Sequence, residues 1–310
     1  MFPYIGGKNH HVKWIDPLLP EQFTRYVEVF GGAGWMMVKS KKVEQSTERV
    51  YNDFNPYLAN VFECMRSDPT RLMETMESTP CGDLTEFQSC QKELFGGDFL
   101  KFPLGDFDMA RKYLYLQTQV FAGTPLSARC VPYFVDVKTR GRYPSKYDTI
   151  IKKLRDPKVI DRLTNITEVT QQDCIDVIDR WDSEDTLFYV DPPYHDKEFY
   201  YSQAFPKHKH EQLADRLRDI RGRFALSYYD FDDLHQFYHK DRFHWHQREV
   251  YRAAATRTSH RDNYRERSRA VEILITNYGG RPWQESRPAR DSRHITRNIT
   301  PEVRSGGPVR

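Results

Sequence analysis

The chain has 310 residues, of which 38% are hydrophobic and 29% charged, and its formal net charge is +3. This length is enough for one large α/β domain, a smaller second domain and a sizeable core. No apolar run approaches the roughly 20 residues of a membrane helix, and the start shows no apolar stretch typical of a signal peptide. The five cysteines include no CxxC pair. These features argue against a membrane or secreted protein, so we expect a cytoplasmic one.

Short apolar runs alternate with amphipathic stretches towards both ends of the chain. Helices are predicted at 55–67 and 210–222, because apolar residues there recur at helical spacing. Strands alternating with helices predict an α/β fold with a mostly parallel sheet. The runs that read as strands are 25–30, 49–54, 168–173, 186–191, 224–229 and 270–278.

The middle of the chain, 68–162, loses this alternation. A helix is predicted at 108–123, and the stretch 129–158 holds nine Lys or Arg against three acids. Aromatic residues are interleaved with these charges, which predicts an inserted, helix-rich domain with a basic, aromatic surface. The aromatic residues are Tyr133, Phe134, Tyr143 and Tyr147. The tail, 281–310, carries seven Arg against three acids and is predicted to be disordered.

Glycines gather in two places near the start. "FPYIGGKN" places Gly6 and Gly7 before Lys8, and "EVFGGAGWMM" runs from a strand into Gly31, Gly32 and Gly34. Glycines after a strand let the backbone approach a ligand closely, at the edge where ligands of open α/β sheets bind. A purely structural turn explains either motif equally well. Neither is the GxGxxG of a dinucleotide site nor a Walker A loop.

Asp53 in "YNDFNP" ends the second predicted strand, nearly twenty residues after the glycine loop. An acid at that position is well placed to accept both hydroxyls of a ribose. The alternative is that Asp53 only caps the helix that follows.

"LFYVDPPYHD" is the most specific motif of the chain. Asp191 ends an apolar strand, and Pro192 and Pro193 stiffen the loop behind it. The Asp191 carboxylate and the Pro192 carbonyl form a fixed pair of acceptors, and Tyr194 offers an aromatic face. Two acceptors and a ring suit a flat heterocycle with an amino group. The alternative is a proline-rich turn with a capping acid.

With these motifs the chain resembles the Dam-like DNA adenine-N6 methyltransferases, which use S-adenosylmethionine. The resemblance covers about 2–67 and 165–279, and implies a Rossmann-like methyltransferase sheet. It divides the chain into a catalytic domain at 1–67 and 163–280, an inserted target recognition domain at 68–162, and the basic tail. The motifs that carry it, in order, are "YIGGK", "EVFGGAG", "YNDFNP", "QQD", "DPPY", "FALSYYD" and "EILITNY".

The resemblance implies a role for each matching position. The cofactor is expected to contact Tyr4, Lys8, Phe30, Gly31, Gly32, Gly34, Asp53, Asp173 and Asp191, with Asp53 on its ribose and Asp173 near its adenine. The target base is expected to contact Asp191, Pro192, Pro193 and Tyr194, with Tyr194 replacing its stacking partners. The residues expected to bind DNA are Arg129, Lys138, Arg140, Arg142 and Lys146.

The implied reaction is methylation of adenine N6 at a specific site in double-stranded DNA, by base flipping and direct in-line transfer. We expect a monomer or a weak dimer on DNA, no obligate protein partner, and a bacterial or phage-infected cell as host, where such enzymes serve restriction-modification. Methylation of cytosine N4 and a non-catalytic DNA-binding protein are the alternatives. We expect no metal, since His235 and His239 on a predicted helix lack further converging ligands.

Overall fold

We describe a computed structural model of the chain for residues 1–4, 6–79, 81–95, 102–120, 130–132, 145–194, 205–251 and 269–279. Several predictions lie outside these residues. They concern Arg129, Lys138, Arg140, Arg142, three aromatic residues of the insertion (Tyr133, Phe134 and Tyr143) and the tail at 281–310.

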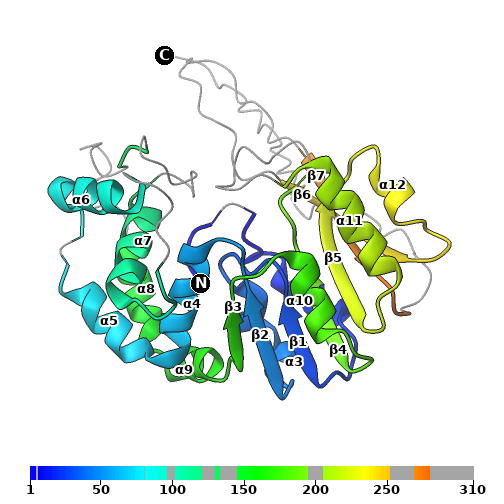
Figure 1. Cartoon of the computed structure of the whole chain (residues 1–310), viewed down its shortest axis with the longest axis horizontal. Helices are drawn as coiled ribbons and strands as arrows, with labels where there is room; N and C mark the ends of the chain where they lie inside the picture. Colours follow the sequence, from blue (N-terminus) through cyan, green and yellow to red (C-terminus); the bar gives the residue numbers. More distant parts are fainter. Residues whose placement is uncertain are drawn as a thin grey trace, which may run out of the picture.

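The described part contains a seven-stranded sheet flanked by helices (Figure 1). Its strands are β1 Arg25–Glu28, β2 Glu48–Asn52, β3 Glu168–Thr170, β4 Thr186–Val190, β5 Arg223–Tyr229, β6 His244–Tyr251 and β7 Arg269–Thr276. The longer helices are α4 Pro56–Ser67, α5 Pro69–Glu77, α6 Leu84–Phe95, α7 Phe107–Gln119, α8 Lys146–Leu154, α9 Pro157–Thr164, α10 Cys174–Trp181 and α11 Lys207–Arg218. The short ones are α1 Val12–Ile15, η1 Asp16–Leu18, α2 Trp35–Lys39, α3 Lys41–Glu44 and α12 Leu234–Phe237.

The strand order is β3-β2-β1-β4-β5-β7-β6, and β7 alone runs against its neighbours. The prediction of an α/β fold with a mostly parallel sheet is confirmed, and so are its six strands. The seventh strand, β6, was missed. Among its side chains Trp245 is buried while His244 and His246 are half-exposed, so the apolar alternation that marks a strand is weak.

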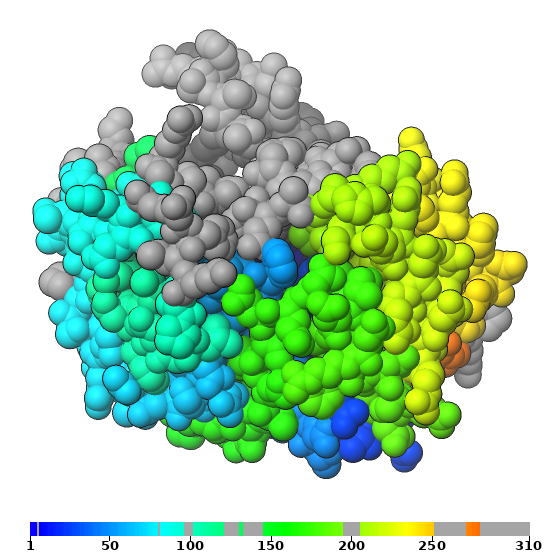
Figure 2. All heavy atoms as spheres, viewed as in Figure 1, coloured from blue at the N-terminus to red at the C-terminus, as the bar shows by residue number. Residues whose placement is uncertain are grey.

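The sheet is buried on both faces. Successive residues of a strand point to opposite faces, so Tyr26 joins the core on one side of the sheet and Val27 the core on the other. Helices α10 and α11 cover the second side, with Val177 and Leu213 in that core. They stand in front of the sheet in Figure 1, and their side chains cover it in Figure 2. Burial on both faces explains why β4 is buried along its whole length and apolar after Thr186.

Helices α5 to α9 form the helix-rich part predicted from the loss of alternation. Their core is continuous with that of the sheet, because one cluster of buried residues includes Tyr115 of α7, Tyr147 of α8 and Tyr51 of β2. Tyr147 was predicted to belong to a basic, aromatic surface, and that prediction is wrong. It is 1% exposed, and its hydroxyl donates to the carbonyl of Met76 at 3.1 Å.

The glycine loop after β1 rests on two stacked rings. The rings of Tyr51, in β2, and Phe62, in α4, lie parallel with centroids 3.8 Å apart. A Cβ atom added to Gly31 would lie 2.2 Å from the Tyr51 ring, and one added to Gly34 would lie 2.4 Å from the Phe62 ring. Gly34 also has a φ of 60°, which favours glycine. Packing therefore requires both glycines, whatever the loop binds.

We predict that Gly31→Ala lowers the free energy of unfolding by about 1–3 kcal/mol, the usual cost of overpacking a core. Urea unfolding followed by circular dichroism measures this. Gly279→Ala is the matched control, because a Cβ there meets no atom within 4 Å. Equal stability of the two variants would show that the Tyr51 and Phe62 rings move aside without cost.

Candidate active site

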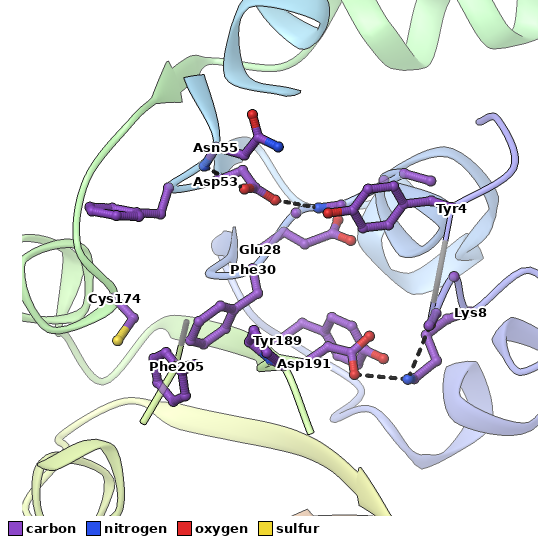
Figure 3. A pocket seen from close by; sticks show the side chains of 18 of the residues that line it. Tyr4, Lys8, Glu28, Phe30, Asp53, Asn55, Cys174, Tyr189, Asp191 and Phe205 are labelled. Carbon is purple, nitrogen blue, oxygen red and sulfur yellow. Dashed lines mark hydrogen bonds and ion pairs between the residues drawn. The ribbon is translucent and has the colours of Figure 1, made fainter. Parts of the chain in front are cut away.

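A pocket of about 220 Å³ opens where the chain leaves the carboxyl ends of β1, β2 and β4. Figure 3 shows Phe30 and Phe205 at one end of it, and Lys8 and Asp191 at the other. Pro192 and Tyr194, which follow Asp191 in the sequence, are not among the residues that line the pocket. The predicted residues that do line it are Tyr4, Lys8, Phe30, Gly31, Gly32, Gly34, Asp53, Asp173, Asp191 and Pro193.

Asp53 connects the loops that follow β1 and β2. Its Oδ2 accepts the backbone N–H of Gly32 at 2.8 Å, and its Oδ1 accepts that of Asn55 at 2.8 Å. Burial raises the pKa of Asp53 to about 6, although these two N–H groups oppose the shift. The alternative that Asp53 caps the next helix is wrong, since the N-cap of α4 is Asn55, which accepts the N–H of Tyr57.

Asn52, the last residue of β2, was not singled out by the sequence analysis and holds two loops together. Its buried amide donates to the carbonyls of Val29 at 2.9 Å and of Gln172 at 3.1 Å, and accepts the N–H of Gln172 at 2.9 Å. One side chain thus fixes the loop after β1 against the loop after β3. An asparagine ending a strand carries no specific signal in the sequence.

The end of the pocket near Asp173 is aromatic. The rings of Phe30 and Phe205 meet edge to face with centroids 5.4 Å apart, and Phe54 is 54% exposed at the rim. Flat aromatic surfaces of this kind suit a planar ring as ligand. Phe205 was missed, because nothing in the stretch around it marks it as part of a site.

Asp173 is the N-cap of α10 and accepts the N–H of Ile175 at 3.0 Å. Its other oxygen pairs with Lys209 of α11 at 2.8 Å. Burial raises the pKa of Asp173, but the Lys209 ammonium and the N–H of Ile175 outweigh this and hold the pKa below its usual range. This carboxylate therefore stays charged at the aromatic end of the pocket.

At the opposite end, Lys8 and Asp191 form a buried ion pair. Lys8 Nζ lies 2.8 Å from Asp191 Oδ1 and also donates to the hydroxyl of Tyr194. Burial lowers the pKa of Lys8, but nearby carboxylates reverse the shift and leave it well above its usual range. Burial raises the pKa of Asp191 to about 6, although Lys8 opposes the shift. The predicted contact of Lys8 with a cofactor remains a prediction.

Tyr194 is 6% exposed in this structure, and its ring packs on Tyr229 with centroids 4.6 Å apart. Its hydroxyl donates to Oδ1 of Asp191 at 3.2 Å. The ring is therefore covered, and stacking on a target base requires that Tyr194 changes its conformation. The stacking role remains a prediction.

Two further pocket residues were missed. Glu28, the last residue of β1, accepts the N–H of Met37 at 3.1 Å and the hydroxyl of Tyr26 at 3.3 Å, and burial raises its pKa to about 8. Tyr189 of β4 lies two residues before Asp191, and its buried hydroxyl has no hydrogen-bond partner among the described residues. That hydroxyl is available to a ligand. The sequence feature that could have identified Glu28 is an acidic residue inside an otherwise apolar predicted strand.

The histidines near the end of the sheet do not form a ligand pair. Helix α12 ends at Phe237, so the predicted helix carrying both His235 and His239 is wrong. The His235 ring instead stacks on Trp245 with centroids 4.5 Å apart. Within the described ranges, no group of three or more His, Cys, Asp or Glu could hold a metal ion, and no helix is long and apolar enough to cross a membrane.

Comparison with known proteins adds to this geometry. Residues 4–254 match the family model described as D12 class N6 adenine-specific DNA methyltransferase. The chain is also similar to the type II methyltransferase M1.LlaDCHI of Lactococcus lactis subsp. cremoris, with 23% identity over 299 residues. That alignment covers 89% of this chain and 94% of the relative.

Proposed function

The chain belongs to the D12 class of N6 adenine-specific DNA methyltransferases, and we propose that its pocket binds S-adenosylmethionine as methyl donor beside an adenine flipped out of double-stranded DNA. The reaction itself, methylation of adenine N6 in DNA, follows from the family. The family also decides between the alternatives raised by the sequence, because it consists of enzymes and is specific for adenine rather than cytosine.

The chemistry of the lining residues fits S-adenosylmethionine. The Asp53 carboxylate is the proposed acceptor for the ribose hydroxyls, since each of its oxygens accepts one backbone N–H and keeps a further lone pair. Phe30 and Phe205 supply aromatic surface for the adenine ring, with Asp173 beside them. When bound, this cofactor supplies an electrophilic methyl group on a positively charged sulfur.

The main support for the proposal is the position of Asp191, whose carboxylate lies in the same pocket as the glycine loop and Asp53. Adenine N6 is a weak nucleophile, since its lone pair is delocalised into the ring. We assign the two N–H groups of that amine to Asp191 and to the carbonyl of Pro192, which favours a more tetrahedral nitrogen and stabilises the charge that develops on it. Transfer would form the bond from N6 to the methyl carbon as the sulfur–methyl bond breaks, without a covalent enzyme intermediate, and N6 would then release one proton.

DNA binding is assigned to the helix-rich part. The base inside a duplex is out of reach of the pocket, so it has to be flipped out. Lys146, at the start of α8, lies in the described part and is half-buried, and burial lowers its pKa. We propose that it acts with Arg129, Lys138, Arg140 and Arg142, and that 68–162 is the target recognition domain, with 1–67 and 163–280 as the catalytic one. By analogy with M1.LlaDCHI, a type II enzyme, we propose a specific recognition site.

We predict that Asp191→Ala lowers the rate of methyl transfer about 10²–10³-fold, the usual cost of losing one transition-state acceptor. Transfer of tritium from the labelled methyl of the cofactor to DNA measures the rate, and sequencing that reports modified bases identifies the base and its site. Asp185→Ala is the matched control, an exposed acid at the other end of β4. Near-normal transfer by Asp191→Ala would refute the assignment.

The pH dependence of the wild-type enzyme follows from the same carboxyl group. With a pKa of about 6, Asp191 gains a proton as the pH falls through 6, and the protonated form accepts less well from the amine. We expect kcat/KM to be constant above about pH 7 and to fall about tenfold per unit below about pH 5. A profile that is flat from pH 5 to 8 would contradict this.

Asp53→Ala is predicted to weaken cofactor binding roughly 10- to 150-fold, because a hydrogen bond to a charged acceptor contributes about 1.5–3 kcal/mol. Calorimetry gives the Kd for the cofactor, and DNA binding without cofactor should hardly change. Asp68→Ala is the matched control, since Asp68 also accepts a backbone N–H, from Arg71 at 2.9 Å, but lies outside the pocket. Equal cofactor affinity of the two variants would leave Asp53 as a structural acid only.

A further inference from the structure

Glu272 is a buried carboxylate in the middle of β7, and nothing above gives it a role. Its side chain is 0% exposed, and its Oε1 accepts the hydroxyl of Ser227, on β5, at 2.7 Å. A buried charge is costly unless it is paired and hydrogen-bonded. The residues that follow it, 273–275, are all apolar and buried, so the charge depends on a specific partner.

That partner is Lys8. Glu272 Oε1 lies 3.3 Å from Lys8 Nζ, the same ammonium that lies 2.8 Å from Asp191 Oδ1. The Tyr194 hydroxyl is shared as well, 3.2 Å from Glu272 Oε1 and 3.2 Å from Asp191 Oδ1. Lys8 and Asp191 line the pocket and Glu272 does not. Glu272 therefore reaches the pocket only through its neighbours.

The donors in this cluster are limited. Lys8 has three N–H groups, and Tyr194 has one O–H for two carboxylates. Oδ1 of Asp191 receives both Lys8 and Tyr194, whereas no described residue donates to its Oδ2. The two oxygens of Asp191 thus have different roles, one anchored and one open to a ligand.

We propose that Glu272 is a positioning residue for methyl transfer, which holds Lys8 and Tyr194 against Oδ1 of Asp191 so that Oδ2 is directed at the target amine. The proposal rests on the function assigned to Asp191 above. Lys8 is the charged link, because its ammonium contacts both carboxylates, and the Tyr194 hydroxyl is a second, uncharged contact between them. Without Glu272 the ammonium keeps its pair with Asp191 but loses the second anchor that fixes its place.

Other charged and titratable groups face Glu272. Its Oε2 has no hydrogen-bond partner within the described residues and lies 4.0 Å from Nδ1 of His11, whose pKa is lowered by burial. Arg248 of β6 and Tyr229 of β5 are its neighbours in register. Burial raises the pKa of Glu272, but Lys8 outweighs this and holds the pKa below its usual range. The Glu272 charge in turn raises the pKa of Asp191.

The test is Glu272→Gln, which keeps the shape and an acceptor oxygen and removes the charge. We expect kcat to fall roughly 10- to 100-fold through misplacement of Asp191, with little change in KM for S-adenosylmethionine. The acid limb of kcat/KM, which reports the free enzyme, should move to lower pH, because one of the charges that raise the pKa of Asp191 is gone. A purely structural role would lower the free energy of unfolding and leave the kcat of the folded variant unchanged.

A double-mutant cycle with Lys8→Met tests the link. Lys8→Met alone should move the acid limb to higher pH, since it removes the cation that favours ionised Asp191. If Glu272 acts through Lys8, adding Glu272→Gln to Lys8→Met should cost much less in kcat than it does in the wild type. Thr276→Val, at a buried position of the same strand, is the control and should leave kcat and the limb unchanged.

Wild-type kcat and an unmoved acid limb in folded Glu272→Gln would overturn the proposal, and so would additive effects in the cycle. If Glu272→Gln does not fold by circular dichroism, Ser227→Ala replaces it, since it removes a hydrogen bond to Oε1 and keeps the charge. A several-fold loss of kcat in that variant supports positioning, and an unchanged kcat overturns it. Activity retained by Asp191→Ala would instead refute the proposed function itself.

Discussion

The site depends on the parallel pairing of β1 with β2 on one side and with β4 on the other. In both pairs the register aligns Glu28 of β1 with a tyrosine, Tyr51 in β2 and Tyr189 in β4. The carboxyl ends of the three strands therefore meet at one edge, where the chain continues into the glycine loop, Asp53 and Asp191. Three segments, the last of them more than a hundred residues beyond the first two in sequence, thus share one pocket because their strands end at the same level.

Four buried or partly buried acids lie at or near this edge, and three kinds of partner stabilise them. Backbone N–H groups hold Asp53, a hydroxyl and an N–H hold Glu28, and the single ammonium of Lys8 pairs with both Asp191 and Glu272. The consequences for charge differ accordingly. Burial raises the pKa of Glu28 to about 8 and that of Asp53 to about 6, whereas the pKa of Glu272 stays below its usual range. Of the acids that line the pocket, Asp53, Asp173 and Asp191 therefore carry negative charge near pH 7.

The helix-rich part is attached to the site through packing. The stack of Tyr51 on Phe62 supports the glycine loop, and α4, which contributes Phe62, packs against α7 in the same core. Asn60 of α4 extends this contact, because its amide accepts the N–H of Gly105 and donates to the carbonyl of Asp106 at the start of α7. The helix-rich part and the glycine loop of the pocket therefore belong to one continuous core.

The sequence by itself determined the fold class, six of the seven strands and part of the pocket lining, because strand periodicity and the motifs after β1, β2 and β4 are local patterns. It did not reveal β6, Asn52, Phe205 or Glu272. Only the tertiary structure decided that Asp53 is not a helix cap, that packing demands Gly31, and that Tyr147 and Tyr194 are buried. It also decided that Lys8 pairs with both Asp191 and Glu272. The physical reason is that these facts depend on contacts between residues far apart in the sequence. Asp191 and Glu272, for example, lie 183 and 264 positions after Lys8. A local sequence pattern carries no information about such contacts.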